Sequence, residues 1–369
     1  MREHHFVRLA CRLLRVRILI ASRVFPPDVL SGSATLIRNL WERLGERHDV
    51  GLVVASHRDP SLLPSDARIV SVDPERTLRG RVGMELAVRR EVARFRPDVL
   101  VAHGIEVPVD LVPTVGLLTD PLAGAARWGR LRGVRQKLYR SRIEKMAIAV
   151  APSTAACRRI EDLGVAGASL RVAWPGVDTA EFRPEEGGEE STLRLLYVAR
   201  MVPDKGQHVA IEAVKGLHDN IRQQVHLDLV GPIEDSAYFS KLRRRAEGAP
   251  VAFHTEVAEL ASWYRRADIV LFPTVGEEVF GYSAVDGMAA GKPVIFSKVS
   301  AVVEVTDGIG VAVPPGDPKR LGEAIRELVR SPDRRRELGR QGRELVVNRY
   351  SWDRAIERYE ELIREAAGK

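Results

Sequence analysis

The amino-acid sequence predicts an α/β protein of two domains, each a doubly wound, Rossmann-like parallel sheet with helices on both faces. Three observations lead to this prediction. At 369 residues the chain is longer than one hydrophobic core usually organises. Short β-branched runs alternate with amphipathic helical stretches. The alternation stops at a polar run near the middle of the chain and then begins again.

The first half contains six apolar runs of strand length. Ile37, Leu40 and Leu44 recur at helical spacing after the first run, so a crossover helix joins the first two strands, as parallel pairing requires. We assign residues 17–184 to an N-terminal domain. The predicted strands are residues 17–22, 50–54, 68–72, 99–103, 114–118 and 147–151.

Residues 185–191 have no apolar side chain and include two adjacent glycines, so they are the best candidate for a linker. The C-terminal domain then covers residues 192–350, and residues 351–369 form a last helix. Ligands of doubly wound sheets bind beyond the carboxyl ends of the strands, so we expect the site in a cleft between the domains. The predicted strands are residues 193–198, 225–230, 251–253, 269–272, 294–296 and 310–313.

Composition narrows the class of partner without selecting one. The net charge of +7 favours nucleotides, phosphorylated acceptors, nucleic acid or an acidic membrane. Cys11 and Cys157 are far apart and have no metal-ligand spacing, so a disulfide framework and a zinc site are not expected and a reducing cytoplasm fits. Residues 1–16 combine an apolar stripe with arginines, which indicates either a membrane-surface helix or an unstructured start. We therefore expect a cytoplasmic protein, either free or peripheral at the inner membrane surface.

Missing motifs exclude other enzyme classes. No G-x-G-x-x-G follows the first strand and no G-x-x-x-x-G-K-[ST] occurs, which disfavours dinucleotide oxidoreductases and P-loop NTPases. No Asp-x-Asp pair is present to hold Mg²⁺ or Mn²⁺. We expect no metal and no cofactor, so protein cations have to neutralise any bound diphosphate.

Two cations, Arg200 and Lys205, follow the strand 193–198, with Gly206 opening the next helix. An Arg fork and a Lys point charge at a strand end stabilise the negative charge that develops on a diphosphate leaving group. The alternative is that both are solvated surface cations.

A second segment follows the strand 269–272. After a turn that carries Glu278, a helix rich in small residues starts near Gly281. The N–H groups of Gly281, Tyr282 and Ser283 then form an anion site at the positive end of the helix dipole. We expect a phosphate there.

These two segments resemble the donor site of the family-4 retaining glycosyltransferases, which have the GT-B fold of two Rossmann-like domains facing each other across a deep cleft. The family shows G-R-x(4)-K-G and E-G-F-G-x(4)-E-A-M-A-x-G stretches. The resemblance implies that Arg200 and Lys205 hold the donor diphosphate and that Glu278 contacts the transferred sugar. Asp286, eight residues later, stands where a family glutamate binds the nucleotide ribose.

The resemblance extends over nearly the whole chain after residue 16. The loop at residues 25–33 is similar to the family's P-P-x-x-G-G stretch, which assigns donor contact to Gly32. Gly231 resembles the glycine of the turn near the nucleotide base. Residues 172–184 resemble the interdomain N-G-V-D-x(3)-F-x-P signature, and residues 350–352 resemble the start of a last helix that crosses back to the N-terminal domain.

The sequence departs from the family pattern at several positions. Asp286 is one methylene shorter than glutamate, and Ser31 replaces a loop glycine. Thr119, followed by Asp120, stands where a histidine near the sugar is common. His103, at the end of the strand 99–103, faces the expected cleft and either substitutes for that histidine or is merely a satisfied polar residue.

The resemblance implies retaining, metal-independent transfer of a sugar from a nucleotide-diphosphate sugar, the co-substrate, to an unidentified acceptor. Basic residues between Arg127 and Arg142 indicate either an anionic or membrane-associated acceptor or a solvated helix face. Nucleic acid is not expected as a partner. Two alternatives stay open: a non-catalytic GT-B protein that binds nucleotide sugars, and another GT-B enzyme such as an epimerase or a phosphorylase.

Overall fold

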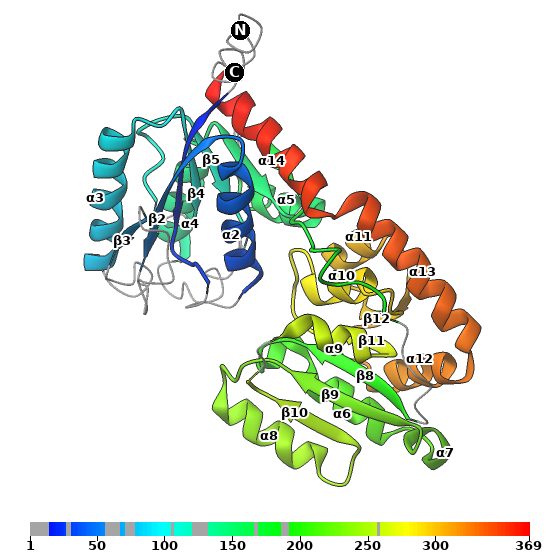
Figure 1. Ribbon diagram of the computed structural model, residues 1–369. Coiled ribbons are helices and arrows are strands. Elements are labelled where there is room, and N and C mark those ends of the chain that lie inside the picture. Colours follow the sequence, from blue (N-terminus) through cyan, green and yellow to red (C-terminus); the bar gives the residue numbers. More distant parts are fainter. Residues whose placement is uncertain are drawn as a thin grey trace, which may run out of the picture. The chain divides into compact units, whose positions relative to one another are not determined.

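The computed structural model describes residues 15–26, 31–55, 67–70, 78–104, 107–119, 132–165, 169–185, 192–256 and 259–369. The chain divides into two compact units (Figure 1). Unit 1 comprises Met1–Pro175 and Asp353–Lys369, and unit 2 comprises Gly176–Trp352.

Unit 1 contains a parallel sheet, with seven strands among the described residues in the order β3-β2-β1-β4-β5-β6-β7. Strand β1 therefore lies between β2 and β4, and the order reverses at the β1/β4 pair. Ser22 and His103, the last residues of β1 and β4, are register partners there. The strands are β1 (Arg17–Ser22), β2 (Asp49–Ala55), β3 (Arg68–Val70), β4 (Val99–His103), β5 (Thr114–Leu117), β6 (Ile148–Ala151) and β7 (Leu170–Val172).

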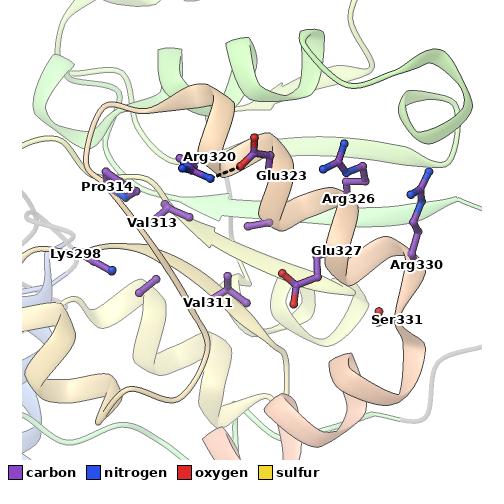
Figure 2. Close-up of a pocket in the computed structure, with 12 residues that line it drawn as sticks. Lys298, Val311, Val313, Pro314, Arg320, Glu323, Arg326, Glu327, Arg330 and Ser331 are labelled. Carbon is purple, nitrogen blue, oxygen red and sulfur yellow. Dashed lines mark hydrogen bonds and ion pairs between the residues drawn. The ribbon is translucent and has the colours of Figure 1, made fainter.

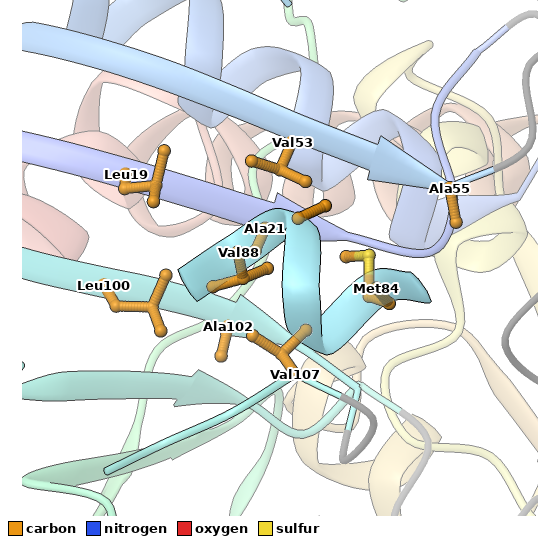
Figure 3. Packing of buried hydrophobic residues seen from close by; sticks show 10 residues of the cluster. Leu19, Ala21, Val53, Ala55, Met84, Val88, Leu100, Ala102 and Val107 are labelled. Atoms are coloured by element: carbon orange, nitrogen blue, oxygen red, sulfur yellow. The ribbon is translucent and has the colours of Figure 1, made fainter. Parts of the chain in front are cut away.

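Helices cover both faces of this sheet (Figure 1). Because side chains alternate along a strand, Leu19 and Ala21 face one side, where they pack with Val88 of α3 (Figure 3). Ile18 and Ile20 face the other side and are fully buried. The helices of unit 1 are α2 (Gly32–Gly45), α3 (Leu78–Phe95), α4 (Arg132–Ile143), α5 (Thr154–Glu161) and α14 (Trp352–Ala367).

The last helix, α14, lies with unit 1. The buried Tyr359 hydroxyl donates to the Ala173 carbonyl oxygen at 3.0 Å. Nearer the end of the chain, Lys369 Nζ donates to Asp98 Oδ2 at 2.7 Å. These contacts and the buried Ile356, Leu362 and Ile363 attach the helix to unit 1.

Unit 2 contains a second parallel sheet, with six strands among the described residues in the order β10-β9-β8-β11-β12-β13. Here the order reverses at the β8/β11 pair. The strands are β8 (Leu193–Val198), β9 (Val225–Val230), β10 (Val251–His254), β11 (Ile269–Phe272), β12 (Val294–Ser297) and β13 (Val311–Val313). The helices are α6 (Gln207–Lys215), α7 (Asp219–Arg222), α8 (Ser236–Ala246), α9 (Leu260–Arg266), α10 (Tyr282–Ala289), α11 (Ser300–Thr306), α12 (Pro318–Arg330) and α13 (Pro332–Arg349).

The division between the units differs from the predicted boundary. The chain divides after Pro175, whereas the sequence suggested a domain end at residue 184 and a linker at 185–191, of which only residue 185 is described. Residues 176–185 pack on unit 2. Arg343 donates to the carbonyl oxygens of Thr179 and Phe182 at 2.9 and 2.7 Å, and the Phe182 ring meets Tyr264 edge-on at 5.4 Å.

The twelve predicted strands are all present, and eleven of them have bounds that differ from the prediction by at most one residue. Strand β3 begins at Arg68 as predicted and is described to Val70, while the predicted residues 71 and 72 lie outside the described residues. Strand β7 was not predicted, because its three residues are half-buried and carry an arginine in the middle. Among the residues placed in the structure, no helix is long and apolar enough to cross a membrane. The predicted extension falls outside the described residues up to position 14.

Close backbone contact in unit 2 predicts the effect of one substitution. A Cβ on Gly339 of α13 would lie 2.0 Å from the carbonyl oxygen of Gly291, whereas a Cβ on Gly45 of α2 would meet nothing within 4 Å. Gly339→Ala should lower the free energy of unfolding by about 1–3 kcal/mol through overpacking. The control Gly45→Ala should leave it unchanged or raise it by up to about 1 kcal/mol, since alanine favours helix. Equal urea midpoints for both variants would contradict the packing.

Candidate functional site

The candidate residues of unit 2 gather at the carboxyl ends of two neighbouring strands. Arg200 and Lys205 follow β8, and Glu278 follows β11, which pairs with β8. The strand order of the sheet reverses between these two strands, which is where open α/β sheets bind their ligands. The topology thus places both predicted segments at one edge of the sheet.

The loops after β8 and β11 are held together through one carbonyl group. The Asp204 carbonyl oxygen accepts from Thr274 Oγ1, Val275 N and Gly276 N, each at 2.9 Å. A Cβ on Gly276 would lie 2.6 Å from the Asp204 Cβ. On the other side of the contact, Gly206 adopts φ +73°, and a Cβ there would lie 2.1 Å from the Pro273 carbonyl oxygen. The two loops can approach this closely only because both positions are glycine.

This contact brings Lys205 and Glu278 together. Lys205 Nζ donates to Glu278 Oε1, and the two side chains are only 18% and 13% exposed. The Lys205 carbonyl oxygen accepts from the buried Tyr197 hydroxyl at 2.5 Å. Burial, and after it the Glu278 charge, raises the pKa of Tyr197, so this hydroxyl remains a neutral donor. An ammonium has three N–H donors, so Lys205 can bind Glu278 and an anionic oxygen at once.

Arg200 has a different partner. Its Nη1 lies 2.5 Å from Oε2 of Glu234, and both side chains are 45% exposed. Glu234 was not among the residues predicted from the sequence, because no motif points to it. The backbone of Arg200 is fixed by the buried Gln207, whose Nε2 donates to the Arg200 carbonyl oxygen at 2.7 Å. Exposed ion pairs contribute little, so turning the guanidinium toward a bound anion costs little.

Gly231 lies beside this segment, at the end of β9. It adopts φ +144°, and a Cβ there would lie 2.2 Å from the carbonyl oxygen of Ala199, the residue after β8. The predicted glycine turn is therefore a place of close backbone approach.

The helix α10 begins at Gly281, as the sequence predicted. Gly281 is the N-cap residue with φ +91° and ψ +51°, a conformation that favours glycine. Tyr282 and Ser283 form the first turn, and among the described residues the Ser283 N–H has no protein acceptor. Ser283 Oγ accepts from the buried Tyr264 hydroxyl at 3.0 Å. The start of the helix can therefore donate to an anion.

Asp286 is half-buried in the second turn of α10. Burial raises its pKa well above the ordinary range, and the nearby Glu181 carboxylate raises it further. Among the described residues, no group donates a hydrogen bond to this carboxylate. A ligand hydroxyl that donates to it would stabilise its charged form.

The candidate residues of unit 1 form a hydrogen-bonded chain. His103 Nδ1 lies 3.0 Å from Ser22 Oγ, and His103 Nε2 lies 2.9 Å from Thr119 Oγ1. Ser33 Oγ, next to Gly32 at the start of α2, donates to Thr119 Oγ1 at 2.9 Å. Asp120 lies outside the described residues.

The position of His103 corrects one expectation. We expected its side chain to face a cleft, but it is only 3% exposed and both ring nitrogens have partners. Burial, with Arg23 as a second cause, lowers the pKa of His103 to about 3. The imidazole is therefore a neutral group with both hydrogen bonds made, which agrees with the interpretation of His103 as a satisfied polar residue. Its bond to Thr119 was not foreseen.

Among the described residues, no group of three or more His, Cys, Asp or Glu side chains could hold a metal ion. An open groove of about 760 Å³ lies between β13 and α12, where Arg320 pairs with Glu323 at 2.9 Å (Figure 2). None of the predicted site residues lines it, and its charged side chains are those of a solvated helix face.

The lowered pKa of His103 predicts a pH dependence of stability. The unfolded chain binds a proton at this histidine below about pH 6.5, but the folded protein does so only near pH 3. Acid between these values therefore favours the unfolded state, by up to about 1.4 kcal/mol per pH unit. Urea unfolding should show wild type losing stability relative to His103→Gln as the pH falls below 6.5, with a constant difference above it. A difference that does not vary with pH would refute the buried neutral ring.

Comparison with known proteins places this geometry in a family. The model of the glycosyl transferases group 1 matches residues 178–345, and that of glycosyltransferase family 4 matches residues 30–181. The first segment contains Arg200, Lys205, Glu278 and Asp286. The two matches adjoin and together extend from residue 30 to residue 345.

Individual relatives and structures agree with these matches. The MMP alpha-(1->4)-mannosyltransferase of Mycolicibacterium hassiacum is 31% identical over 242 residues, which span 62% of this chain but only 57% of the relative. The glycogen synthase of Mycobacterium tuberculosis is 26% identical over 385 residues, 91% of this chain and 92% of the relative. The structure of Anabaena HepE in complex with UDP superposes with a TM-score of 0.78 at 17% identity, covering 95% of this chain and 100% of HepE. This likeness confirms the predicted α/β fold of the GT-B type, and the two family matches show that the chain belongs to the group 1, family 4 glycosyltransferases.

Proposed function

We propose that this chain transfers a sugar from a nucleoside-diphosphate sugar to an acceptor, with retention of anomeric configuration and without a metal ion. The observation that carries the proposal is the contact between Lys205 and Glu278 where the sheet of unit 2 reverses its strand order. A cation for the leaving group and a carboxylate for the sugar stand side by side there.

The chemistry follows from the charge that the reaction creates. When the glycosidic bond breaks, negative charge grows on the leaving diphosphate. Three donors are available to it: the Lys205 ammonium, the Arg200 guanidinium, and the Ser283 N–H at the start of α10, which has no acceptor among the described residues. Fixed donors in a partly dry site stabilise such a charge without reorganising, which is the usual role of a metal ion.

The two carboxylates then have separate roles. Glu278 accepts from hydroxyls of the transferred sugar, and Asp286 accepts from the ribose of the nucleotide. The leaving diphosphate itself takes the proton of the acceptor hydroxyl, so attack and departure occur on one face and the configuration is retained. No covalent glycosyl-enzyme step is needed in this scheme.

The proposed function is tested by binding and turnover together. UDP-glucose, GDP-mannose, UDP-N-acetylglucosamine and ADP-glucose are screened by thermal shift. A donor at 100 times its Kd should add about 2.7 kcal/mol to the stability. Donor hydrolysis or transfer, unaffected by EDTA, should accompany binding. Binding without any product would instead identify a non-catalytic binding protein, and activity lost with EDTA and restored by Mg²⁺ or Mn²⁺ would reject the metal-free scheme.

Lys205 should affect activity and stability separately. Lys205→Met should lose about 2–4 kcal/mol of transition-state stabilisation in kcat/KM. It also removes the Lys205 charge that compensates Glu278 in a mostly buried site, and this lowers the stability. Adding Glu278→Gln to this variant should restore the melting temperature but not kcat/KM. Recovery of both would show that the pair has only a structural role.

Arg200→Ala should lose kcat/KM on the same scale as Lys205→Met. The matched control is Arg320→Ala, which removes an exposed ion pair of unit 2 that lies apart from the site. It should leave kcat/KM unchanged. Equal kinetics for the two arginine variants would remove Arg200 from the diphosphate site.

The carboxylates are distinguished by which kinetic constant changes. Bonds from the sugar to Glu278 strengthen as the ring flattens toward an oxocarbenium ion, so Glu278→Gln should mainly lower kcat. The ribose does not change during the reaction, so Asp286→Asn should mainly raise the donor KM. A lost hydrogen bond to a charged group corresponds to about 1.5–3 kcal/mol. If Asp286→Asn lowered kcat while Glu278→Gln did not, the two roles would be reversed.

A further inference from the structure

The hydrogen-bonded chain of unit 1 lies where the strand order of its own sheet reverses. Ser22 ends β1 and His103 ends the neighbouring β4. Thr119 follows β5, the next strand, and Ser33 lies in the first turn of α2. Four elements thus meet at the position where a doubly wound sheet binds a ligand.

The positions of the protons in this hydrogen-bonded chain follow from the contacts of Ser22, its most buried member. Ser22 Oγ donates its only proton to the Val24 carbonyl oxygen at 2.8 Å and accepts from Val24 N at 3.1 Å. Its contact with His103 must therefore run from Nδ1–H to Oγ. Because the buried ring is neutral, Nε2 carries no proton and accepts from the Thr119 hydroxyl.

The hydrogen bonds of Thr119 and Ser33, the two residues farthest from Ser22 in this hydrogen-bonded chain, then have a single direction. The Thr119 proton goes to His103, and the Ser33 proton goes to Thr119 Oγ1. Both hydroxyls are half-buried and have no other partner among the described residues. While these bonds are made, only lone pairs remain on Ser33 Oγ and Thr119 Oγ1, so toward a ligand both oxygens act as acceptors. They attract an O–H group, whereas an oxygen of a phosphate or carboxylate would face two electron-rich atoms.

We propose that Ser33 and Thr119 form a subsite for a neutral sugar hydroxyl. His103 is a positioning residue: by accepting the Thr119 proton, it orients both hydroxyl groups so that their oxygens accept from the ligand. The subsite rests on the proposed function for the identity of its ligand, a hydroxyl of either the donor sugar or the acceptor. It differs in kind from the site in unit 2, whose lysine and helix start suit an anion.

Paired substitutions separate this role from a merely structural one. His103→Gln places an amide oxygen near the position of Nε2 and keeps an acceptor for Thr119. His103→Asn places an amide N–H near Nδ1, which keeps the bond to Ser22 but leaves Thr119 without its acceptor. Thr119→Ser keeps the hydroxyl, and Thr119→Val removes it with little change of shape. Melting temperatures of all four variants confirm that each is folded.

The donor arm of the test measures the affinity of UDP-glucose, or of whichever nucleotide sugar binds most tightly in the screen, by calorimetry. Each sugar hydroxyl is replaced in turn by hydrogen and by fluorine, which can accept but cannot donate. At one position both replacements should weaken binding to wild type by about 10-fold, the scale of one hydrogen bond. Thr119→Val and His103→Asn should lose this discrimination, and His103→Gln and Thr119→Ser should keep it. Fluorine retaining the affinity that hydrogen loses would overturn the polarity.

The acceptor arm compares donor hydrolysis with transfer. If Thr119→Val and His103→Asn raise only the acceptor KM, by about 10-fold, and leave donor affinity and hydrolysis unchanged, the hydroxyl belongs to the acceptor and the proposal holds. If neither variant differs from its paired partner in either arm, the residues only stabilise the fold and the proposal fails.

A third measurement needs no substrate. ¹⁵N NMR of histidine-labelled protein, with His103→Gln to assign the signal, should show the neutral Nδ1–H form between pH 5 and 8. An Nε2–H form or an imidazolium would overturn the proposal even if the protein transfers sugars. Conversely, if no nucleotide sugar binds, the proposed function fails while this result still decides the polarity of the chain.

Discussion

The candidate site of unit 2 depends on one carbonyl oxygen. Asp204 O accepts three hydrogen bonds from the loop after β11, so the turn after β8 cannot move independently of that loop. Gly206 and Gly276 permit this contact, since a Cβ at either would collide with the other loop. The central ion pair of the site follows from this contact: the ammonium of Lys205 meets the carboxylate of Glu278, although 73 residues separate them in sequence. A charged pair held by backbone geometry is preorganised and need not be assembled by the ligand.

The two units use the same topological position for different chemistry. Each sheet reverses its strand order once within the described residues, at β1/β4 and at β8/β11. Unit 2 places cations and the start of a helix there, and unit 1 places a neutral histidine and three hydroxyls. Burying a neutral group costs less desolvation free energy than burying a charge. A neutral site instead selects its ligand by whether the ligand donates or accepts the hydrogen bond. An anionic group and a neutral hydroxyl therefore call for different kinds of site.

The strands and the start of α10 could be predicted from the sequence. The contact between His103 and Thr119 and the boundary between the units could not, because both depend on residues that are far apart in the chain. Strands such as β8 and β9 were placed correctly because buried parallel strands read as short apolar runs. The start of α10 was predictable because Gly281 is followed by a run of small residues. Local pattern does not report which strands are neighbours, so the contact of His103 with Thr119 could not be foreseen. The unit boundary was misplaced because a polar run marks a break in pattern, whereas Arg343, far along the chain, binds the residues before it.

Unit 2 is one continuous stretch, and the places where the chain enters and leaves it are adjacent. Val177 N donates to the Tyr350 carbonyl oxygen at 2.7 Å, and a Cβ on Gly176 would lie 2.4 Å from the Trp352 ring. Unit 1, by contrast, needs residues from both sides of unit 2. During translation the ribosome therefore releases all of unit 2 before it releases α14, whose Ile356 and Leu362 are buried in the finished protein. The unit whose synthesis starts first is the last to be completed, and until then it exposes apolar surface on which nascent chains aggregate and chaperones act.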